Sequence, residues 1–188
     1  MDAFAPGQRI GLLGGSFDPA HDGHHHLSME ARRRFGLDRI VWLVSPGNPL
    51  KPDPPAPIDE RIAQARRVAS APWLAVSDLE YRIGSRFTAQ TVHHLVTRHP
   101  RARFVWLMGA DNLAQVHRWD RWRRIFAMVP VGVLARPGYR LSARRSVAAR
   151  VYAAARLPEA AARRLPTAKP PAWCYVTIPL HPASSTQI

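Results

Sequence analysis

The amino-acid sequence predicts an α/β fold with a doubly wound parallel sheet in a single domain. Short apolar runs rich in β-branched and aromatic residues alternate along the chain with segments of helical periodicity. Such runs are typical of buried parallel strands, and the helices between them supply the crossovers that parallel strands need. The chain has 188 residues, enough for one well-filled core, so we expect residues 1–188 to form one domain.

Strands are expected where apolar runs are short and continuous: Ile10–Leu13, Ile40–Val44, Leu74–Val76, Phe104–Met108, Val131–Leu134 and Tyr175–Ile178. Helices are expected over Gly23–Phe35, Asp59–Ala69, Ala89–Arg98, Trp119–Ala127 and Ala143–Arg156. Residues 45–57, 135–139 and 165–172 contain proline and lack either period, so they are predicted to be loops or connections. The first two loops follow strands, on the side where such sheets bind ligands.

The most informative segment, Gly14 to His24, follows the first predicted strand and reads Gly-Gly-Ser-Phe-Asp-Pro-Ala-His-Asp-Gly-His. Its glycines let the backbone approach a ligand closely, and the helix that follows offers free N–H groups and a positive dipole end. His21 and His24 share one face of the first turn, where they are able to donate to phosphate oxygens; a protonated ring would add positive charge. The plain alternative is a packed strand-to-helix connection. The coincidence of these features favours a polyphosphate ligand, and hence nucleotide chemistry.

The histidines next to this motif also raise the question of a metal site. His25 and His26 follow His24 directly, but consecutive helical residues point about 100 degrees apart, and no cysteine or carboxylate stands at ligand spacing. We therefore expect no structural zinc and assign His25 and His26 to packing and partial exposure.

The formal net charge of +14 raises a hypothesis of another class, a basic nucleic-acid-binding protein. Almost all the cations are arginines, because Lys51 and Lys169 are the only lysines. The arginine clusters lie on predicted helices and are not interleaved with aromatic residues as in RNA-binding motifs. A basic surface that attracts anionic substrates explains the charge, so we expect no specific nucleic-acid partner.

The single cysteine and the absence of long apolar runs concern the compartment. Cys174 is unable to form an internal disulfide, which favours a reducing compartment and a buried, inert thiol. No segment reaches the roughly 20 apolar residues of a membrane span, and the amino terminus lacks a signal-peptide layout. We expect a cytoplasmic protein that does not enter membranes.

Two signatures at opposite ends of the chain resemble those of the nucleotidyltransferases with a His-x-Gly-His motif. The first is the Gly14–His24 segment, and the second is Ser184-Ser185-Thr186-Gln187-Ile188. Within that superfamily the chain is most similar to bacterial nicotinate-nucleotide adenylyltransferases, through residues 80–88, 109–113, 117–119 and 136–139 as well. The resemblance implies a Rossmann-like sheet. It also implies a reaction that joins nicotinate mononucleotide to the AMP part of ATP, giving nicotinate adenine dinucleotide and pyrophosphate, with Mg²⁺ that arrives with ATP.

The resemblance also assigns roles to residues. His21, His24 and, less securely, Lys51 are the candidate catalytic groups, in a reaction without a covalent intermediate. ATP is expected on the backbone and side chains of Gly15, Ser16, Phe17, His21, His24, Ser184, Ser185 and Thr186. Nicotinate mononucleotide is expected at Thr88, Asp111, Trp119 and Arg136. Each of these four has an alternative role: a helix N-cap for Thr88 and Asp111, a core position for Trp119 and a solvated position for Arg136.

Three points stay open at this stage. Pantetheine-phosphate adenylyltransferases share both signatures but usually have threonine where this chain has His21, and a nicotinamide-accepting relative is the other rival. The family usually has an arginine directly after the Ser-Ser-Thr-x-Ile turn, whereas this chain stops at Ile188. We therefore expect a longer natural protein, or one whose tail and C-terminal helix have been removed. The protein could be a monomer or a homo-oligomer.

Overall fold

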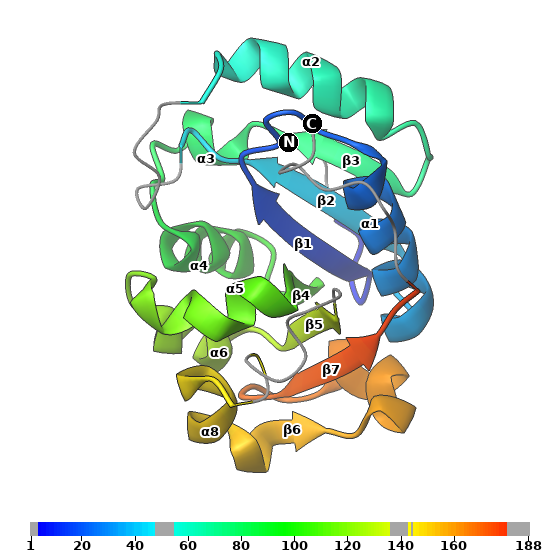
Figure 1. Ribbon diagram of the computed structural model, residues 1–188, viewed down its shortest axis with the longest axis vertical. Helices are drawn as coiled ribbons and strands as arrows, with labels where there is room; N and C mark the ends of the chain where they lie inside the picture. The colour runs from blue at the N-terminus through cyan, green and yellow to red at the C-terminus, as the bar shows by residue number, and fades with distance from the viewer. Residues whose placement is uncertain (1–3, 48–54, 136–142, 144, 180–188) are drawn as a thin grey trace.

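A computed structural model describes residues 4–47, 55–135, 143 and 145–179. Helices cover both faces of one parallel sheet (Figure 1), which confirms the predicted α/β fold. The strands are β1 (Arg9–Gly15), β2 (Arg39–Val44), β3 (Leu74–Ser77), β4 (Arg103–Gly109), β5 (Val131–Ala135), β6 (Arg156–Leu157) and β7 (Trp173–Thr177). The helices are α1 (Asp22–Phe35), α2 (Ile58–Val68), α3 (Leu79–Arg82), α4 (Thr88–Arg98), α5 (Ala110–Gln115), α6 (Trp122–Met128) and α8 (Val147–Val151), with the 3₁₀ segments η1 (Val116–Arg118), η2 (Ala153–Ala155) and η3 (Glu159–Thr167).

The strand order places a topological switch point at the centre of the sheet. The strands lie side by side in the order β3-β2-β1-β4-β5-β7-β6. The chain builds outward from β1 to β3, then returns to β1 and builds toward the other edge from β4. Leu12 of β1 pairs with Val41 on one side and Trp106 on the other. Ligands in such sheets bind at the carboxyl ends of the strands beside this reversal, between β1 and β4.

The two faces of the sheet bury separate apolar clusters, because neighbouring residues of a strand point to opposite faces. On one face Leu12 and Trp106 contact residues of α4, α5 and α6, such as Leu95. On the other face Leu13 and Trp42 contact residues of α1, α2 and η3. Figure 1 shows α4, α5 and α6 to the left of the sheet and α1 to its right.

Two predicted helices were placed wrongly. The helix expected over Trp119–Ala127 begins only at Trp122, because Trp119 is extended and Arg121 takes the left-handed conformation with φ +46°. The helix expected over Ala143–Arg156 is replaced by α8, η2 and β6. Ser146 caps α8 by accepting from the Ala149 N–H at 3.2 Å. The Tyr152 carbonyl ends the helical run by accepting from Trp173 Nε1 at 2.7 Å.

Other segments gained structure that the pattern did not predict. The start of the connection over residues 165–172 belongs to η3, whose Leu165 is fully buried. Helices α3 and α5 and the two-residue strand β6 were also not expected, since each is too short to show a period. The predicted loops over residues 45–57 and 135–139 lie largely outside the described residues.

Cys174 and the arginine clusters behave as expected. The Cys174 thiol is buried, and burial raises its pKa to about 11, which keeps it protonated and inert. Arg32, Arg33, Arg123, Arg124, Arg163 and Arg164 are exposed, as expected for solvated helix faces. No helix in the described parts of the chain is both long and apolar enough to cross a membrane.

Candidate active site

The first predicted site element, the exit from β1, lies at the switch point. Gly14 and Gly15 are the last residues of β1, so they extend the strand instead of forming the turn. A Cβ on Gly14 would lie 2.7 Å from Cη2 of Trp106, the β4 residue whose indole covers this glycine. Glycine at this position therefore lets the indole pack against the end of β1.

The two signature histidines form the cap of α1. Nδ1 of His21 accepts from the Gly23 N–H at 3.1 Å, and Nδ1 of His24 accepts from the His21 N–H at 3.3 Å. An imidazole nitrogen that accepts a hydrogen bond carries no proton, so in this arrangement Nε2 is the nitrogen of each ring that is able to donate.

A stack of rings fixes where these donors lie. Phe17 stacks on Trp42 with ring centroids 4.8 Å apart, His24 lies 5.0 Å from Phe17, and His21 lies 3.9 Å from His24. The indole Nε1 of Trp42 donates to Ser28 Oγ, whose hydroxyl donates to the His24 carbonyl, both at 2.8 Å. The imidazole pair is therefore anchored to the core through β2.

A cleft of about 390 Å³ opens over the carboxyl ends of β1 and β2. It brings together four residues expected from the sequence: Gly15 and Ser16 on the predicted ATP side, and Thr88 and Trp119 on the predicted mononucleotide side. Its other lining residues are Gly14, Ser45, Gly47, Glu80, Arg86, Phe87, Trp106, Asn112, Gln115, Arg118 and Asp120. Phe17, His21, His24 and Asp111 do not line it; Phe17 is packed in the core and His21 is 7% exposed.

The structure bears on the alternative roles that were considered for three residues on the predicted mononucleotide side. Thr88 is the first residue of α4, whose N-cap is Phe87, so the capping role considered for Thr88 is wrong. Trp119 is partly buried, packs against the core and also lines the cleft, while Trp122 is buried against Phe126 and Tyr152. Asp111 caps no helix, because Gly109 is the N-cap of α5. Within the described chain its Oδ1 is buried without a hydrogen-bond partner.

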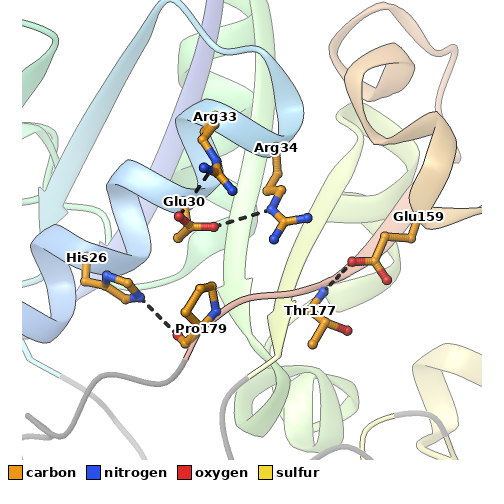
Figure 2. Close-up of polar contacts among 7 residues, drawn as sticks. All are labelled: His26, Glu30, Arg33, Arg34, Glu159, Thr177 and Pro179. Carbon is orange, nitrogen blue, oxygen red and sulfur yellow. Dashed lines mark hydrogen bonds and ion pairs between the residues drawn. The ribbon is translucent and has the colours of Figure 1, made fainter.

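Three of the site elements predicted from the sequence lie outside the described residues: Lys51, Arg136 and Ser184 to Thr186. The chain that leads toward the second signature is described as far as Pro179, and Figure 2 shows how it is held. The Thr177 N–H donates to the Glu159 carboxylate at 2.8 Å, and the ring Nε2 of His26 lies 3.0 Å from the Pro179 carbonyl. The exit from β7 is therefore tied to α1, the helix that carries His21 and His24.

Sequence reasoning missed Glu80. This glutamate is 7% exposed, lines the cleft and accepts from the Thr91 hydroxyl at 3.0 Å. Burial raises its pKa to about 7, although the bond from Thr91 opposes the rise. The Thr91 hydroxyl also lies 2.9 Å from Ser85 Oγ, so the network reaches the turn before Phe87 and Thr88. Glu80 lies in the segment 80–88 that resembles the family, but α3 is a single turn and shows no period that would have indicated the burial of this side chain.

Sequence reasoning also missed Arg61 and Trp106. Arg61 lies three residues after Ile58 and one before the buried Ile62, a spacing that places it on the apolar face of α2 and could have revealed it. Trp106 Nε1 is a buried donor for which the described residues supply no acceptor, and its ring borders the cleft.

Among the described residues, no three histidine, cysteine or acidic side chains gather closely enough to hold a metal ion.

The chain matches the protein family described as Cytidylyltransferase-like over residues 12–188. A probable nicotinate-nucleotide adenylyltransferase of Cereibacter sphaeroides is 63% identical over 179 residues, which cover 95% of each chain. One of Roseobacter denitrificans is 55% identical over 182 residues, 97% of this chain and 92% of the relative. One of Methylorubrum extorquens is 52% identical over 181 residues, 96% of this chain and 98% of the relative.

Solved structures share the fold at much lower identity. The nicotinic acid mononucleotide adenylyltransferase of Plasmodium falciparum complexed with NaAD has a TM-score of 0.67 and 16% identity, covering 92% of this chain and 76% of that one. The same enzyme complexed with APC has a TM-score of 0.66 and 15% identity, covering 92% and 75%. At this identity the likeness concerns the fold alone.

Proposed function

The chain belongs to the cytidylyltransferase-like family and, within it, to the nicotinate-nucleotide adenylyltransferases, and from that premise we propose that it transfers the adenylyl group of ATP to nicotinate mononucleotide. The products are nicotinate adenine dinucleotide and pyrophosphate, a step of NAD biosynthesis. One observation carries the proposal: the glycine-containing strand-to-helix turn at the switch point lines the same cleft as Thr88 and Trp119.

The ATP side of the proposed site is built from the first signature. The amides of Ser16 and Phe17, the start of α1 and the Nε2 donors of His21 and His24 all suit phosphate oxygens. We assign Gly15 to close approach of the backbone, and Ser184, Ser185 and Thr186 to the outer phosphates, as their places in the two signatures indicate. Lys51 adds positive charge from its loop. Mg²⁺ would enter with ATP, held by substrate phosphates and water.

The acceptor side is built from the helical wall of the cleft. The partly exposed ring of Trp119 offers a stacking surface for a flat pyridine, and the Thr88 hydroxyl offers a donor for its carboxylate. Arg86 and Arg118 add positive charge to the same wall, which suits an anionic mononucleotide. Asp111 is assigned to the ribose and Arg136 to the phosphate of the mononucleotide, as the family resemblance implies.

The proposed reaction needs no covalent intermediate. An oxygen of the mononucleotide phosphate attacks the α-phosphorus of ATP, and the bond from that phosphorus to the bridging oxygen breaks, so that pyrophosphate leaves with the electron pair. His21 and His24, as donors through Nε2, stabilise the charge that grows on the phosphate oxygens, and the amides of the turn hold those oxygens in line for the attack. The buried free thiol Cys174 is consistent with work in the reducing cytoplasm.

A pyrophosphate-release assay with three acceptors tests this proposal. Nicotinate mononucleotide, nicotinamide mononucleotide and phosphopantetheine are each supplied with MgATP, and release is followed under identical conditions. The proposal predicts the highest kcat/KM with nicotinate mononucleotide. A higher value with phosphopantetheine or the nicotinamide compound would overturn the assigned acceptor, and no release with any of them would overturn the reaction.

A further inference from the structure

Arg61 is an arginine buried in an unusual environment beneath the candidate site. It lies in the second turn of α2 and is 1% exposed, although arginine is rarely buried so completely. Within the described residues no carboxylate forms an ion pair with it, and the charge of Asp18 acts on it only from a distance. A buried charge of this kind needs hydrogen bonds to offset its lost hydration.

Backbone carbonyls supply those bonds. Nε of Arg61 donates to the Ala56 carbonyl at 2.7 Å, and Nη1 donates to the carbonyls of Ser16 at 2.7 Å and Ser45 at 2.8 Å. Nη2 makes a longer bond to the Pro46 carbonyl at 3.4 Å. These acceptors come from three separate segments: the turn after β1, the turn after β2 and the approach to α2. Arg61 thus ties the two strand exits of the cleft to one point.

The bonds to Ser16 and Pro46 also decide where the next amides point. In a trans peptide the carbonyl and the following N–H point in opposite directions. The Ser16 carbonyl faces Arg61, so the Phe17 N–H points away from Arg61. The Pro46 carbonyl also faces Arg61, so the Gly47 N–H points away from Arg61 as well. Ser16, Ser45 and Gly47 line the cleft. The guanidinium therefore gathers the carbonyls on its own side and leaves the Phe17 and Gly47 amides pointing away from it, an arrangement that suits an anion.

The backbone at Phe17 needs such support. Its φ of +49° is in the left-handed region, which is unfavourable for a residue with a side chain. The Phe17 ring is held by its stack on Trp42, and the preceding peptide is held by Arg61. Without the guanidinium, the Ser16–Phe17 peptide would be free to rotate toward an ordinary conformation and to withdraw its N–H.

We propose that Arg61 is a positioning residue that orients the Phe17 and Gly47 amides toward the phosphate groups of ATP. This inference rests on the proposed function, since it takes ATP as the ligand of the turn. Arg61 itself touches no substrate. A single ammonium has no planar fork, so lysine should not reproduce the set of bonds even though it keeps the charge.

The test compares Arg61→Lys and Arg61→Met with Arg66→Lys and Arg66→Met, because Arg66 is exposed on the same helix. Circular dichroism and thermal unfolding first establish which variants fold. The dissociation constants of ATP and adenosine are then measured for each folded variant, together with kcat and KM. We expect Arg61→Lys to bind ATP about tenfold more weakly, the worth of one hydrogen bond to a charged group. Adenosine binding should be unchanged, and the Arg66 variants should match the wild type.

An equal loss of affinity for ATP and adenosine in a folded Arg61→Lys protein would overturn the inference, and so would an unchanged affinity for ATP. If Arg61→Met does not fold, Arg61→Lys still decides. A second measurement separates failure of the Arg61 inference from failure of the proposed function. The Phe17 and Gly47 amide resonances are followed by NMR during titration with inorganic tripolyphosphate, and they should shift in the wild type and not in Arg61→Lys. A wild type that makes no dinucleotide would refute the proposed reaction alone.

Discussion

Replacement of Glu80 by glutamine should make the protein more stable at alkaline pH and abolish part of its pH dependence. Glu80 is 7% exposed, and its carboxylate accepts a hydrogen bond from the Thr91 hydroxyl at 3.0 Å. A glutamine carbonyl accepts the same bond, so the change removes the charge and keeps the contact. Glu60, exposed in α2, provides the matched control through Glu60→Gln.

The magnitude follows from the pKa of Glu80, which burial raises from 4.5 to about 7. Between these values the folded protein keeps a proton that the unfolded chain releases, so stability falls as pH rises through this window. Each unit of pKa corresponds to about 1.4 kcal/mol, so the loss by pH 8 amounts to about 3 kcal/mol. Glu80→Gln avoids this loss. For a chain of this length the gain corresponds to a rise in Tm of about 6–12 °C.

Thermal unfolding of the wild type, Glu80→Gln and Glu60→Gln from pH 4 to pH 8 measures the effect. The Tm advantage of Glu80→Gln should be small at pH 4 and grow through pH 7, while Glu60→Gln should follow the wild type. An advantage that stays constant with pH would mean that Glu80 does not titrate in this range, and the reasoning from burial would be refuted.

Three further substitutions test the site. His24→Ala should lower turnover about 10²- to 10³-fold in a folded protein, the usual effect of losing one donor to developing charge; steady-state kinetics with unchanged turnover would remove His24 from the reaction. Trp119→Ala should weaken the binding of nicotinate mononucleotide by roughly 1–3 kcal/mol, the scale of base–aromatic stacking, and leave the binding of ATP unchanged. An equal loss of affinity for both ligands in titrations would mean that Trp119 is a core residue only. Gly14→Ala would place its Cβ 2.7 Å from Cη2 of Trp106 and should cost about 1–3 kcal/mol of unfolding free energy by overpacking, with a change in tryptophan fluorescence; urea denaturation with wild-type stability would show that the indole moves freely.

The alternation of apolar runs was sufficient to predict the sheet, because strands buried on both faces carry a continuous apolar signal. Periodicity failed where single hydrogen bonds, one local and one tertiary, decided the local structure. Ser146 starts a new helix inside the predicted Ala143–Arg156 segment, and the bond from Trp173 Nε1 to the Tyr152 carbonyl ends it. Both partners of the second contact are distant in the sequence, so no local pattern carries the information.

The site was predictable where a motif concentrates its residues and not where burial creates the chemistry. The spacing of His21 and His24 indicated a shared helix turn, but only the structure shows that their Nδ1 atoms cap it and leave Nε2 as the donor. The spacing of Arg61 next to Ile58 and Ile62 indicates a place on the apolar face of α2, but it does not indicate a role. Its role depends on carbonyls from residues 16, 45, 46 and 56, which the fold brings together.

The most direct test of adenylyl transfer is to follow isotope from nicotinate mononucleotide whose phosphate oxygens are ¹⁸O, incubated with unlabelled MgATP. Attack of that phosphate on the α-phosphorus predicts a dinucleotide, found by mass spectrometry, that retains all the label, including the bridging oxygen. The pyrophosphate should then carry none. Label in the pyrophosphate, or no dinucleotide from a folded and concentrated protein, would contradict the proposed reaction.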